Sequence, residues 1–339
     1  MTARLPDVAD VAAAASRLRP LLAPTPLVRS ERFEAWLKLE TLQATGSYKV
    51  RGASNAMLVA LANGDRRPIV AASAGNHARG VAWAANRLGL TAHTVVPVTA
   101  PLTKVRGTEA LGAKVIRFGS SYEEAQEHAL LLGRQNGWRL LPAFDDADVI
   151  AGQGTVGWEL LDPLPDVVLV PLGGGGLAAG IGVALASRGV KIVGVHVEGL
   201  DAMARALAGR APLDAAPSTI ADGVRVRSVG HLTRSICAHV LDDIITVPEA
   251  LVRKTVVELA AFDRVVAEGA GALACAALER VRARRKVAVV SGGNIDLETL
   301  AALTRDMEAS AHHAYGSMWP ASVHDDDVDR ARDAIAASA

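Results

Sequence analysis

The sequence predicts an α/β protein with two open, twisted and mostly parallel sheets that carry helices on both faces. Short apolar runs alternate with helical patterns of about 10 to 15 residues, as they do in βαβ units. Aromatic residues make up only 4% of the chain and glycines number 31, which suits helices packed closely on sheets. Four β-branched runs indicate strands buried on both faces, at residues 167–170, 192–197, 244–247 and 287–290.

The first fifty residues lead into this alternation. An alanine-rich pattern predicts a helix over residues 8–22, which ends before Pro24. Residues 25–27 are interpreted as an extended segment and residues 36–39 as the end of a strand. A helix is then predicted from Lys49 to about residue 63.

The regular alternation predicts how the chain divides into domains. Strands are predicted at residues 69–71, 94–96 and 115–118 and near residue 140, each of the first three followed by a helix. We expect residues 52–145 to form a small mobile domain inserted into a large one made of residues 1–51 and 146–310. The composition changes near the end of the chain, so residues 311–339 are predicted to be a C-terminal appendage.

The bulk composition narrows the classes of partner. Lys+Arg and Asp+Glu both number 36, so the chain has no basic field that would attract nucleic acid, and a small molecule is the expected partner. No run of about 18 apolar residues and no signal-peptide pattern is present, so neither a membrane span nor secretion is predicted. Cys237 and Cys275 form no disulfide framework or metal cluster, which favours a cytoplasmic location.

Lys49 lies where an apolar strand end runs into a helix, after a polar turn that contains Gly46. In an open α/β sheet such junctions line the ligand crevice. Beside Tyr48 and apolar surface, the lysine amine could lose its proton and attack a carbonyl carbon as a nucleophile. From this stretch alone, an ordinary surface lysine at a helix start remains the alternative.

A run of four glycines, Gly173, Gly174, Gly175 and Gly176, follows a buried strand and precedes a helix. Backbone N–H groups that converge at a helix N-terminus bind phosphate, and this is the favoured interpretation over a loop that only permits close packing. The same run with Ala178 also satisfies a loose dinucleotide fingerprint, with Glu198 as the ribose-binding acid. An NAD-dependent oxidoreductase is therefore a competing hypothesis.

Two further turns follow predicted strands. Ser73-Ala74-Gly75-Asn76-His77 is a second nest of N–H groups that could hold a carboxylate, and His77 alone is interpreted as a capping or core histidine. Ser291 follows the last long strand, where its hydroxyl could face the crevice. An amine, two anion nests and a hydroxyl are the groups needed to hold a phosphate-bearing aldehyde as an imine beside an amino-acid carboxylate.

Six motifs together resemble those of the fold-type II pyridoxal-phosphate enzymes, whose fold is like that of the tryptophan synthase β subunit, and specifically the threonine/serine dehydratase family, which includes serine racemases. The resemblance extends over about residues 20 to 305. The motifs lie at residues 47–53, 73–77, 150–155, 173–176, 219–223 and 291–294.

The resemblance implies a role for each of these positions. Lys49 would form the Schiff base with pyridoxal 5′-phosphate and then take the Cα proton of the substrate, with Tyr48 packed against the pyridine ring. Gly173, Gly174, Gly175 and Gly176 would hold the phosphate, Asn76 the ring O3′ and Ser291 the pyridine nitrogen. Ser73, Ala74, Gly75, Asn76 and His77 would hold the substrate carboxylate. The implied reaction is that of a lyase, the conversion of L-threonine or L-serine to 2-oxobutanoate or pyruvate and ammonia by β-elimination of the hydroxyl.

Departures from the family pattern narrow the choice. Serine racemases carry a serine where this chain has Ala74, so poor racemisation is expected. The family's cation site begins at the position of Glu198, but Ala204 stands where the resemblance implies an aspartate, which leaves a divalent or monovalent cation open. The stretch between residues 27 and 36 is short, so a larger 3-hydroxy amino acid, such as phenylserine or a hydroxyectoine-derived one, is an alternative substrate. A homodimer is the family expectation, and a non-catalytic binding protein is a third hypothesis.

Overall fold

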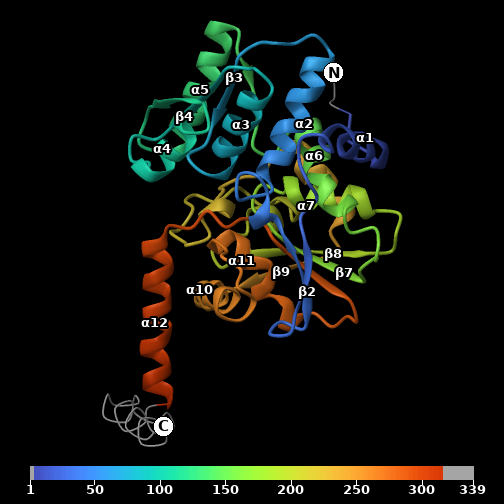
Figure 1. The fold of residues 1–339 in the computed structure, drawn as a ribbon, viewed down its shortest axis with the longest axis vertical. Helices are drawn as coiled ribbons and strands as arrows, with labels where there is room; N and C mark the ends of the chain where they lie inside the picture. The colour runs from blue at the N-terminus through green and yellow to red at the C-terminus, as the bar shows by residue number, and fades with distance from the viewer. Residues whose placement is uncertain (1–3, 316–339) are drawn as a thin grey trace, which may run out of the picture. The chain divides into compact units, whose positions relative to one another are not determined.

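The structure is a computed structural model that describes residues 4–315 (Figure 1). The described residues up to Ile295 form one compact unit, and a second unit begins at Asp296. Within the second unit the structure describes the helix α12 (Leu297–Tyr315), which runs across the boundary predicted at residue 311. The rest of the predicted C-terminal appendage, residues 316–339, lies outside the described residues. The boundaries of the large and small domains stay a prediction.

The larger sheet has six strands in the order β1-β2-β10-β7-β8-β9. Only the β1–β2 pair is antiparallel, which agrees with the predicted class of mostly parallel sheets. The strands are β1 (Leu27–Ser30), β2 (Ala35–Leu39), β7 (Val167–Pro171), β8 (Lys191–Val197), β9 (Asp243–Val247) and β10 (Lys286–Val290).

Helices cover both faces of this sheet. Val168 and Val170 of β7 belong to the same apolar core as the helix α7. Because side chains alternate along a strand, Leu169 points to the opposite face, and α11 packs against β7 and β10. The helices outside the smaller sheet are α1 (Val8–Leu18), α6 (Ala147–Trp158), α7 (Gly176–Leu185), α8 (Ala202–Leu207), α9 (His231–Val240), α10 (Glu249–Glu258) and α11 (Gly269–Ala276).

The smaller sheet has four parallel strands in the order β5-β4-β3-β6. Val70 packs with Ala125 and Ala129 of α5 on one face, whereas Ile69 packs with Met57 of α2 on the other. The elements are α2 (Lys49–Ala62), β3 (Ile69–Ala72), α3 (Asn76–Arg87), β4 (Ala92–Val96), α4 (Leu102–Glu109), β5 (Lys114–Arg117), α5 (Tyr122–Asn136) and β6 (Arg139–Leu140).

Short helical turns complete the unit, and two predicted segments differ from the structure. The first helix ends at Leu18 rather than at residue 22, because Pro20 has no N–H group to continue it. The segment predicted as extended, residues 25–27, shares only Leu27 with β1, whose pairing with β2 was not predicted. The turns are the 3-10 helices η1 (Glu40–Leu42), η2 (Asp222–Val224) and η4 (Leu278–Arg280) and the π-helix η3 (Leu259–Asp263).

The sheet order brings three of the predicted motifs together. The strands β2, β10 and β7 are neighbours, and their carboxyl ends lead to Lys49, to Ser291 and to the four-glycine loop at residues 173–176. In an open parallel sheet, the crevice outside the carboxyl ends of the strands binds ligands. The fold therefore builds its candidate site from segments that are far apart in the sequence.

Candidate active site

Lys49 is the first residue of α2, and its side chain is partly buried. Its Nζ donates a hydrogen bond of 3.0 Å to the carbonyl oxygen of Ala143 and lies 5.2 Å from the centre of the Tyr48 ring. Burial lowers the pKa of Lys49 to about 8, although the nearby Glu268 carboxylate acts in the opposite direction. This amine loses its proton far more readily than an exposed lysine amine does.

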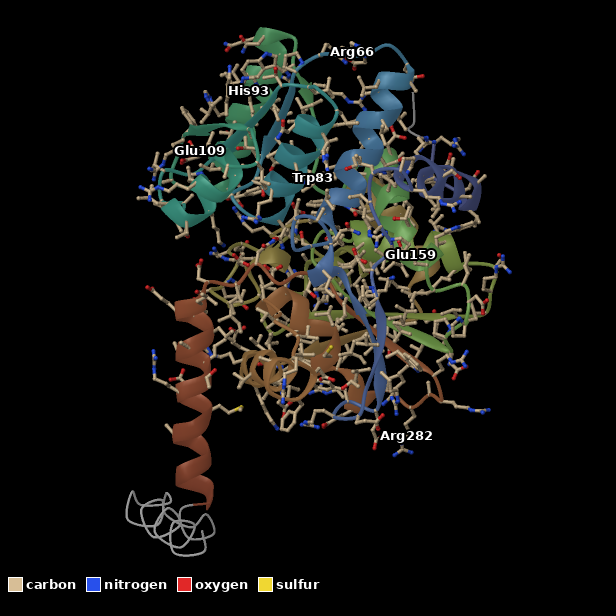
Figure 2. The ribbon with its side chains drawn as sticks, in the orientation of Figure 1. Arg66, Trp83, His93, Glu109, Glu159 and Arg282 are labelled. Atoms are coloured by element: carbon tan, nitrogen blue, oxygen red, sulfur yellow. The ribbon has the colours of Figure 1, made fainter. Side chains whose placement is uncertain are left out.

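A buried ion cluster holds the start of α2. Arg51 donates to Glu40 at 2.7 Å and to Glu159 at 2.5 Å, and Lys38 also donates to Glu159 at 2.5 Å (Glu159 is labelled in Figure 2). Two cations and two carboxylates balance their charges away from water. Because Arg51 follows Lys49 by two residues, the cluster anchors the turn of helix that carries the amine.

The four-glycine loop leads into the N-terminus of α7. Gly175 has φ +89°, a left-handed conformation that favours glycine. A Cβ atom at Gly174 would lie 2.4 Å from Cδ1 of Phe144, so the loop also needs glycine for close packing. The first N–H groups of α7 have no helical partner and carry the positive end of the helix dipole, as an anion site requires.

The segment at residues 143–146 lies between Lys49 and the four-glycine loop. The carbonyl of Ala143 accepts from Lys49, and the ring of Phe144 packs on Gly174. Asp145 accepts a hydrogen bond of 2.9 Å from the N–H of Thr233, in the first turn of α9. Capping of α9 by Asp145 therefore fixes the segment that contacts the lysine.

The turn at residues 73–77 joins β3 to α3. Ser73 Oγ accepts from the N–H of Gly75 at 3.2 Å, and Ala74 beside them is half-buried. His77 is buried, and its Nε2 lies 3.0 Å from the carbonyl oxygen of Leu141. Burial, and then the charge of Lys49, lowers the pKa of His77 to about 3, so the ring is neutral. Its ring is therefore a core group, as the sequence indicates.

Asn76 and Ser291 both lie in this crevice. The amide Nδ2 of Asn76 donates to Glu268 Oε1 at 2.5 Å, and its Oδ1 accepts from Asn294 Nδ2 at 2.7 Å. Ser291 is 4% exposed, its Oγ donates to the carbonyl oxygen of Ala270 at 3.3 Å, and its own carbonyl accepts from the N–H of Tyr48. Tyr48 thus links Ser291 to Lys49, and Glu268 links Asn76 to the same lysine.

Sequence analysis missed Glu268. It stands in an Ala-Gly-rich stretch and is one acid among 36 Asp and Glu residues. In the structure it is buried, contacts Asn76 and influences the pKa of Lys49. Only an unusual sequence feature, an acidic residue directly before the apolar helix α11, marks it in the chain.

A comparison with protein-family models decides which family this arrangement belongs to. The model described as "Pyridoxal-phosphate dependent enzyme" matches residues 18–292, which include Lys49, Asn76, the four-glycine loop, Glu268 and Ser291. The chain belongs to this family. The match explains the four-glycine loop without a dinucleotide, so the oxidoreductase hypothesis is not carried further.

Named relatives and solved structures place this pyridoxal-phosphate dependent enzyme more closely. The chain is 42% identical to an L-threonine ammonia-lyase of Thermotoga maritima over 275 residues, which cover 79% of this chain and 69% of the relative. A processed threonine deaminase isoform 2 from Solanum lycopersicum has a TM-score of 0.82 and 33% identity, covering 88% of this chain and 86% of that one. A maize serine racemase has a TM-score of 0.83 and 30% identity, covering 91% and 100%.

The residues of the crevice fit pyridoxal phosphate, the cofactor of the family. An aldehyde needs an amine with a lowered pKa, and Lys49 is one. A phosphate needs converging N–H donors, and the start of α7 supplies them. Asn76 and Ser291 add an amide and a hydroxyl, the groups suited to the ring oxygen and the ring nitrogen of the cofactor.

The cation site at Glu198 stays a prediction. Glu198 follows β8 and is exposed. Among residues 4–315, no group of three or more His, Cys, Asp and Glu side chains is placed to hold a metal ion. No helix within these residues is long and apolar enough to cross a membrane.

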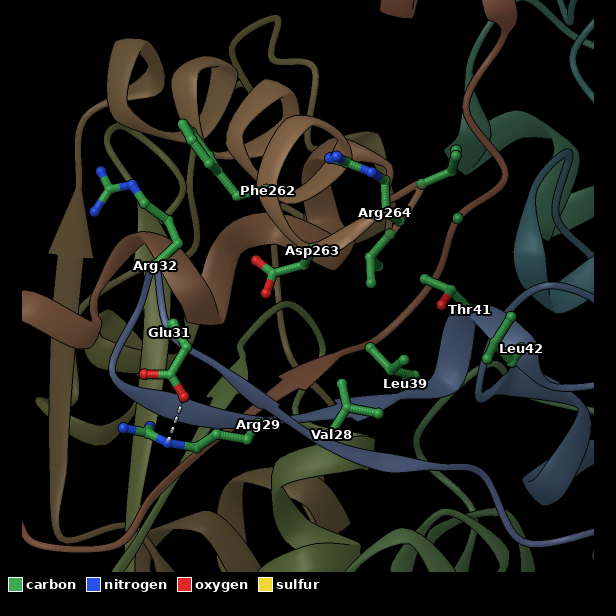
Figure 3. Close-up of a pocket in the computed structure, with 13 residues that line it drawn as sticks. Val28, Arg29, Glu31, Arg32, Leu39, Thr41, Leu42, Phe262, Asp263 and Arg264 are labelled. Carbon is green, nitrogen blue, oxygen red and sulfur yellow. Dashed lines mark ion pairs between the residues drawn. The ribbon is translucent and has the colours of Figure 1, made fainter.

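A cavity of about 770 Å³ opens beside the first strands of this enzyme (Figure 3). None of the predicted site residues lines it. The side chains of Leu42, Phe262 and Val266 in its lining are 64%, 62% and 46% exposed. The remaining lining includes charges of both signs, among them Arg29, Glu31, Arg32, Asp263 and Arg264.

Proposed function

We propose that this chain is an ammonia-lyase that converts L-threonine to 2-oxobutanoate and ammonia and L-serine to pyruvate and ammonia. The observation that carries the proposal is the 42% identity with an L-threonine ammonia-lyase over 275 residues. The geometry around Lys49 supports it, because an amine of lowered pKa lies among groups suited to a phosphate and a carboxylate.

We assign the residues of the crevice the following tasks. Lys49 would hold the cofactor aldehyde and would take the Cα proton of the substrate at Nζ. The N–H groups of residues 73–77 bind the substrate carboxylate, and those at the start of α7 bind the cofactor phosphate. Asn76 binds the ring oxygen of the cofactor, and Tyr48 packs beside the ring.

Ser291 steers the reaction towards elimination. Pyridoxal phosphate supplies an electron sink that acidifies the Cα–H bond of the bound amino acid. Ser291 offers the pyridine nitrogen a neutral hydroxyl, which does not protonate it and so keeps the sink weak. Loss of the β-hydroxyl is therefore favoured over reactions that need a long-lived carbanion at Cα. The hydroxyl takes up a proton and leaves as water. The released enamine becomes an imine, whose C=N bond water hydrolyses, so the net products are a 2-oxo acid and ammonia.

The test is a product assay with purified enzyme and added pyridoxal phosphate. We expect 2-oxobutanoate and ammonia from L-threonine in equal amounts, and no product from the Lys49→Ala variant. Phenylserine is assayed beside threonine and serine, and a higher kcat/KM for phenylserine would replace the substrate assignment by the larger 3-hydroxy amino acid. An enzyme that binds the cofactor but releases no 2-oxo acid from any of them would overturn the proposal.

We further propose that the enzyme is a homodimer. The interface is the surface patch around the cavity lined by Leu42, Phe262 and Val266. A two-fold contact uses the same patch on both subunits, so the patch must complement itself. An apolar centre beside arginines and carboxylates meets this requirement, since each sign can face the other across the axis. Arg264 has no ion-pair partner within residues 4–315, which leaves it available to a second copy.

The proposed location is the cytoplasm. Cys237 and Cys275 are both free thiols and both buried, which is the usual state of cysteines in a reducing compartment.

A further inference from the structure

Glu268 is a buried carboxyl group in the crevice, and the proposed reaction assigns it no role. Glu268 is the N-cap residue of α11 and is 6% exposed. Its Oε1 accepts a hydrogen bond of 2.5 Å from Asn76 Nδ2. The backbone of Asn294 acts to lower the pKa of this carboxyl group. A Cβ atom at Gly292 would lie 2.5 Å from Oε1, so glycine makes the room for this side chain.

The hydrogen bonds around Glu268 determine which way the Asn76 amide faces. The carbonyl oxygen of Thr45 can only accept, so the atom of Asn294 that lies 2.9 Å from it must be the donor Nδ2. The same Nδ2 donates to Asn76 at 2.7 Å, which identifies the acceptor as Asn76 Oδ1. Asn76 Nδ2 therefore faces Glu268.

This chain of bonds leaves one donor for a ligand. Both N–H groups of Asn294 Nδ2 are used, by Thr45 and by Asn76. One N–H of Asn76 Nδ2 is used by Glu268, and the second remains. Glu268 Oε1, an acceptor, thus favours the orientation of the Asn76 amide in which Nδ2 rather than Oδ1 faces Glu268. In this orientation Asn76 offers a ligand an N–H donor.

The charges around Glu268 come from three other elements. Burial, and then Asp222 of η2, raises the pKa of Glu268 to about 7, against the hydrogen bond from Asn76 and the charge of Lys104 on α4. Lys104 and Asp222 themselves form an ion pair. Lys49, at the start of α2, also interacts with Glu268, and Tyr48 beside it is neutral because burial raises its pKa.

We propose that Glu268 is a positioning residue that orients the Asn76 amide towards the ring oxygen of pyridoxal phosphate and carries a proton on Oε2 while that oxygen is bound. The proposal rests on the role of Asn76 assigned above. A carboxylate and a negative ring oxygen would repel each other across one shared Nδ2, and protonation removes this repulsion. The proton comes from solvent, and Oε1 still accepts from Asn76.

The experiment measures cofactor binding without turnover. Cofactor-free enzyme of the Lys49→Ala background is titrated with pyridoxine 5′-phosphate, which has the ring oxygen but no aldehyde, from about pH 6 to pH 9. At each pH the dissociation constant of the enzyme that retains Glu268 is divided by that of the Glu268→Gln variant. The ionisation of the ligand affects both constants equally and therefore cancels in this ratio. Glutamine keeps an acceptor for Asn76 and cannot ionise.

We expect the Glu268 enzyme and the Glu268→Gln variant to bind alike near pH 6. Above pH 7 the Glu268 enzyme must first take up a proton, so its relative affinity falls about tenfold by pH 8 and further at pH 9. Glu249→Gln is the matched control, since this half-buried carboxylate binds Thr219 and Ile220 but does not contact Asn76, and its ratio should stay flat. Glu268→Ala should bind more weakly than Glu268→Gln at every pH.

A ratio that does not change between pH 6 and pH 9 would overturn the proton assignment. Equal binding by Glu268→Ala and Glu268→Gln would overturn the positioning role, provided that thermal unfolding shows both variants folded. Should Glu268→Ala fail to fold, the comparison of the Glu268 enzyme with Glu268→Gln across pH still decides the proton assignment. Because no turnover is involved, a failure of threonine as substrate leaves this result unaffected, and the two proposals fail separately.

Discussion

The amino group of Lys49 donates a 3.0 Å hydrogen bond to the carbonyl oxygen of Ala143, which joins the start of α2 to the segment packed on the four-glycine loop. The partner is a neutral carbonyl rather than a carboxylate. It therefore holds the amine in place without the strong stabilisation of the ammonium form that a full negative charge would give. The site keeps its lysine both positioned and easily deprotonated.

We predict that capture of pyridoxal phosphate by the cofactor-free enzyme accelerates with pH up to about 8 and then levels off. Only the neutral amine attacks the aldehyde, and the pKa of Lys49 is lowered from 10.5 to about 8. Stopped-flow absorbance measures the rate, with Lys49→Ala as the blank. A rate that keeps rising about tenfold per pH unit beyond pH 9 would show an ordinary lysine.

Gly174→Ala should lower the free energy of unfolding by about 1–3 kcal/mol and weaken cofactor binding, because its Cβ would lie 2.4 Å from the Phe144 ring. The double variant Gly174→Ala with Phe144→Ala removes the obstructing ring and should recover part of the binding. Urea unfolding and cofactor titration provide the two measurements. Additive losses in the double variant would argue against this contact as the cause.

Glu40→Gln should lower the free energy of unfolding by about 3–5 kcal/mol, since it leaves the buried Arg51 without one of its two carboxylates. The matched control is Glu123→Gln, which removes an exposed carboxylate 3.8 Å from Arg227, outside the cavity lining, and should cost at most about 1 kcal/mol. Both values come from denaturant unfolding of the same preparation. Similar small losses in the two variants would mean that the cluster does not stabilise the fold.

Ala74→Ser should raise the conversion of L-serine to D-serine by roughly tenfold or more relative to pyruvate formation. The half-buried Ala74 lies in the turn that we assign to the substrate carboxylate, and a hydroxyl there supplies the acid/base group that the second face of Cα lacks. Chiral chromatography measures the two products in one reaction. An unchanged ratio would show that a hydroxyl at this position is not sufficient for racemisation.

Phe262→Asp should convert the proposed dimer to monomers, because it places a charge in the apolar centre of the patch. Light scattering after size-exclusion chromatography measures the mass. Leu131→Glu is the control, since Leu131 is also exposed, at 46%, but lies on α5 outside the cavity lining. A wild-type enzyme that is already monomeric at micromolar concentration would refute the interface.

Much of the fold follows from local sequence. The β-branched runs predict β7, β8, β9 and β10 to within a few residues, because strands buried on both faces need continuous apolar side chains. The strand β1 escaped prediction because its stability comes from pairing with β2, and nothing within its four residues alternates clearly. The helix α6 was not predicted either, since Gly152, Gly154 and Gly157 weaken its helical pattern.

The residues of the candidate site also fall into two groups, those that local sequence indicates and those that depend on tertiary contacts. Lys49, the four-glycine loop and Ser291 could be found because each follows a recognisable strand end. Glu268 could not, because its importance depends on partners distant in the sequence, Asn76 and Asp222, that only the folded chain brings to it. The packing of Phe144 on Gly174 likewise depends on tertiary contact and leaves no local signal.

The central place of β10 in the larger sheet affects how the protein is made. Its strand pairs with β2 on one side and β7 on the other, so until residue 290 is synthesised the sheet consists of two halves, β1–β2 and β7–β8–β9. A ribosome needs on the order of ten to fifty seconds to travel from β2 to β10. Throughout that time β2 presents an unpaired edge, and β7 does so once residue 171 has been synthesised. These two edges are where a nascent chain of this enzyme is most exposed to aggregation.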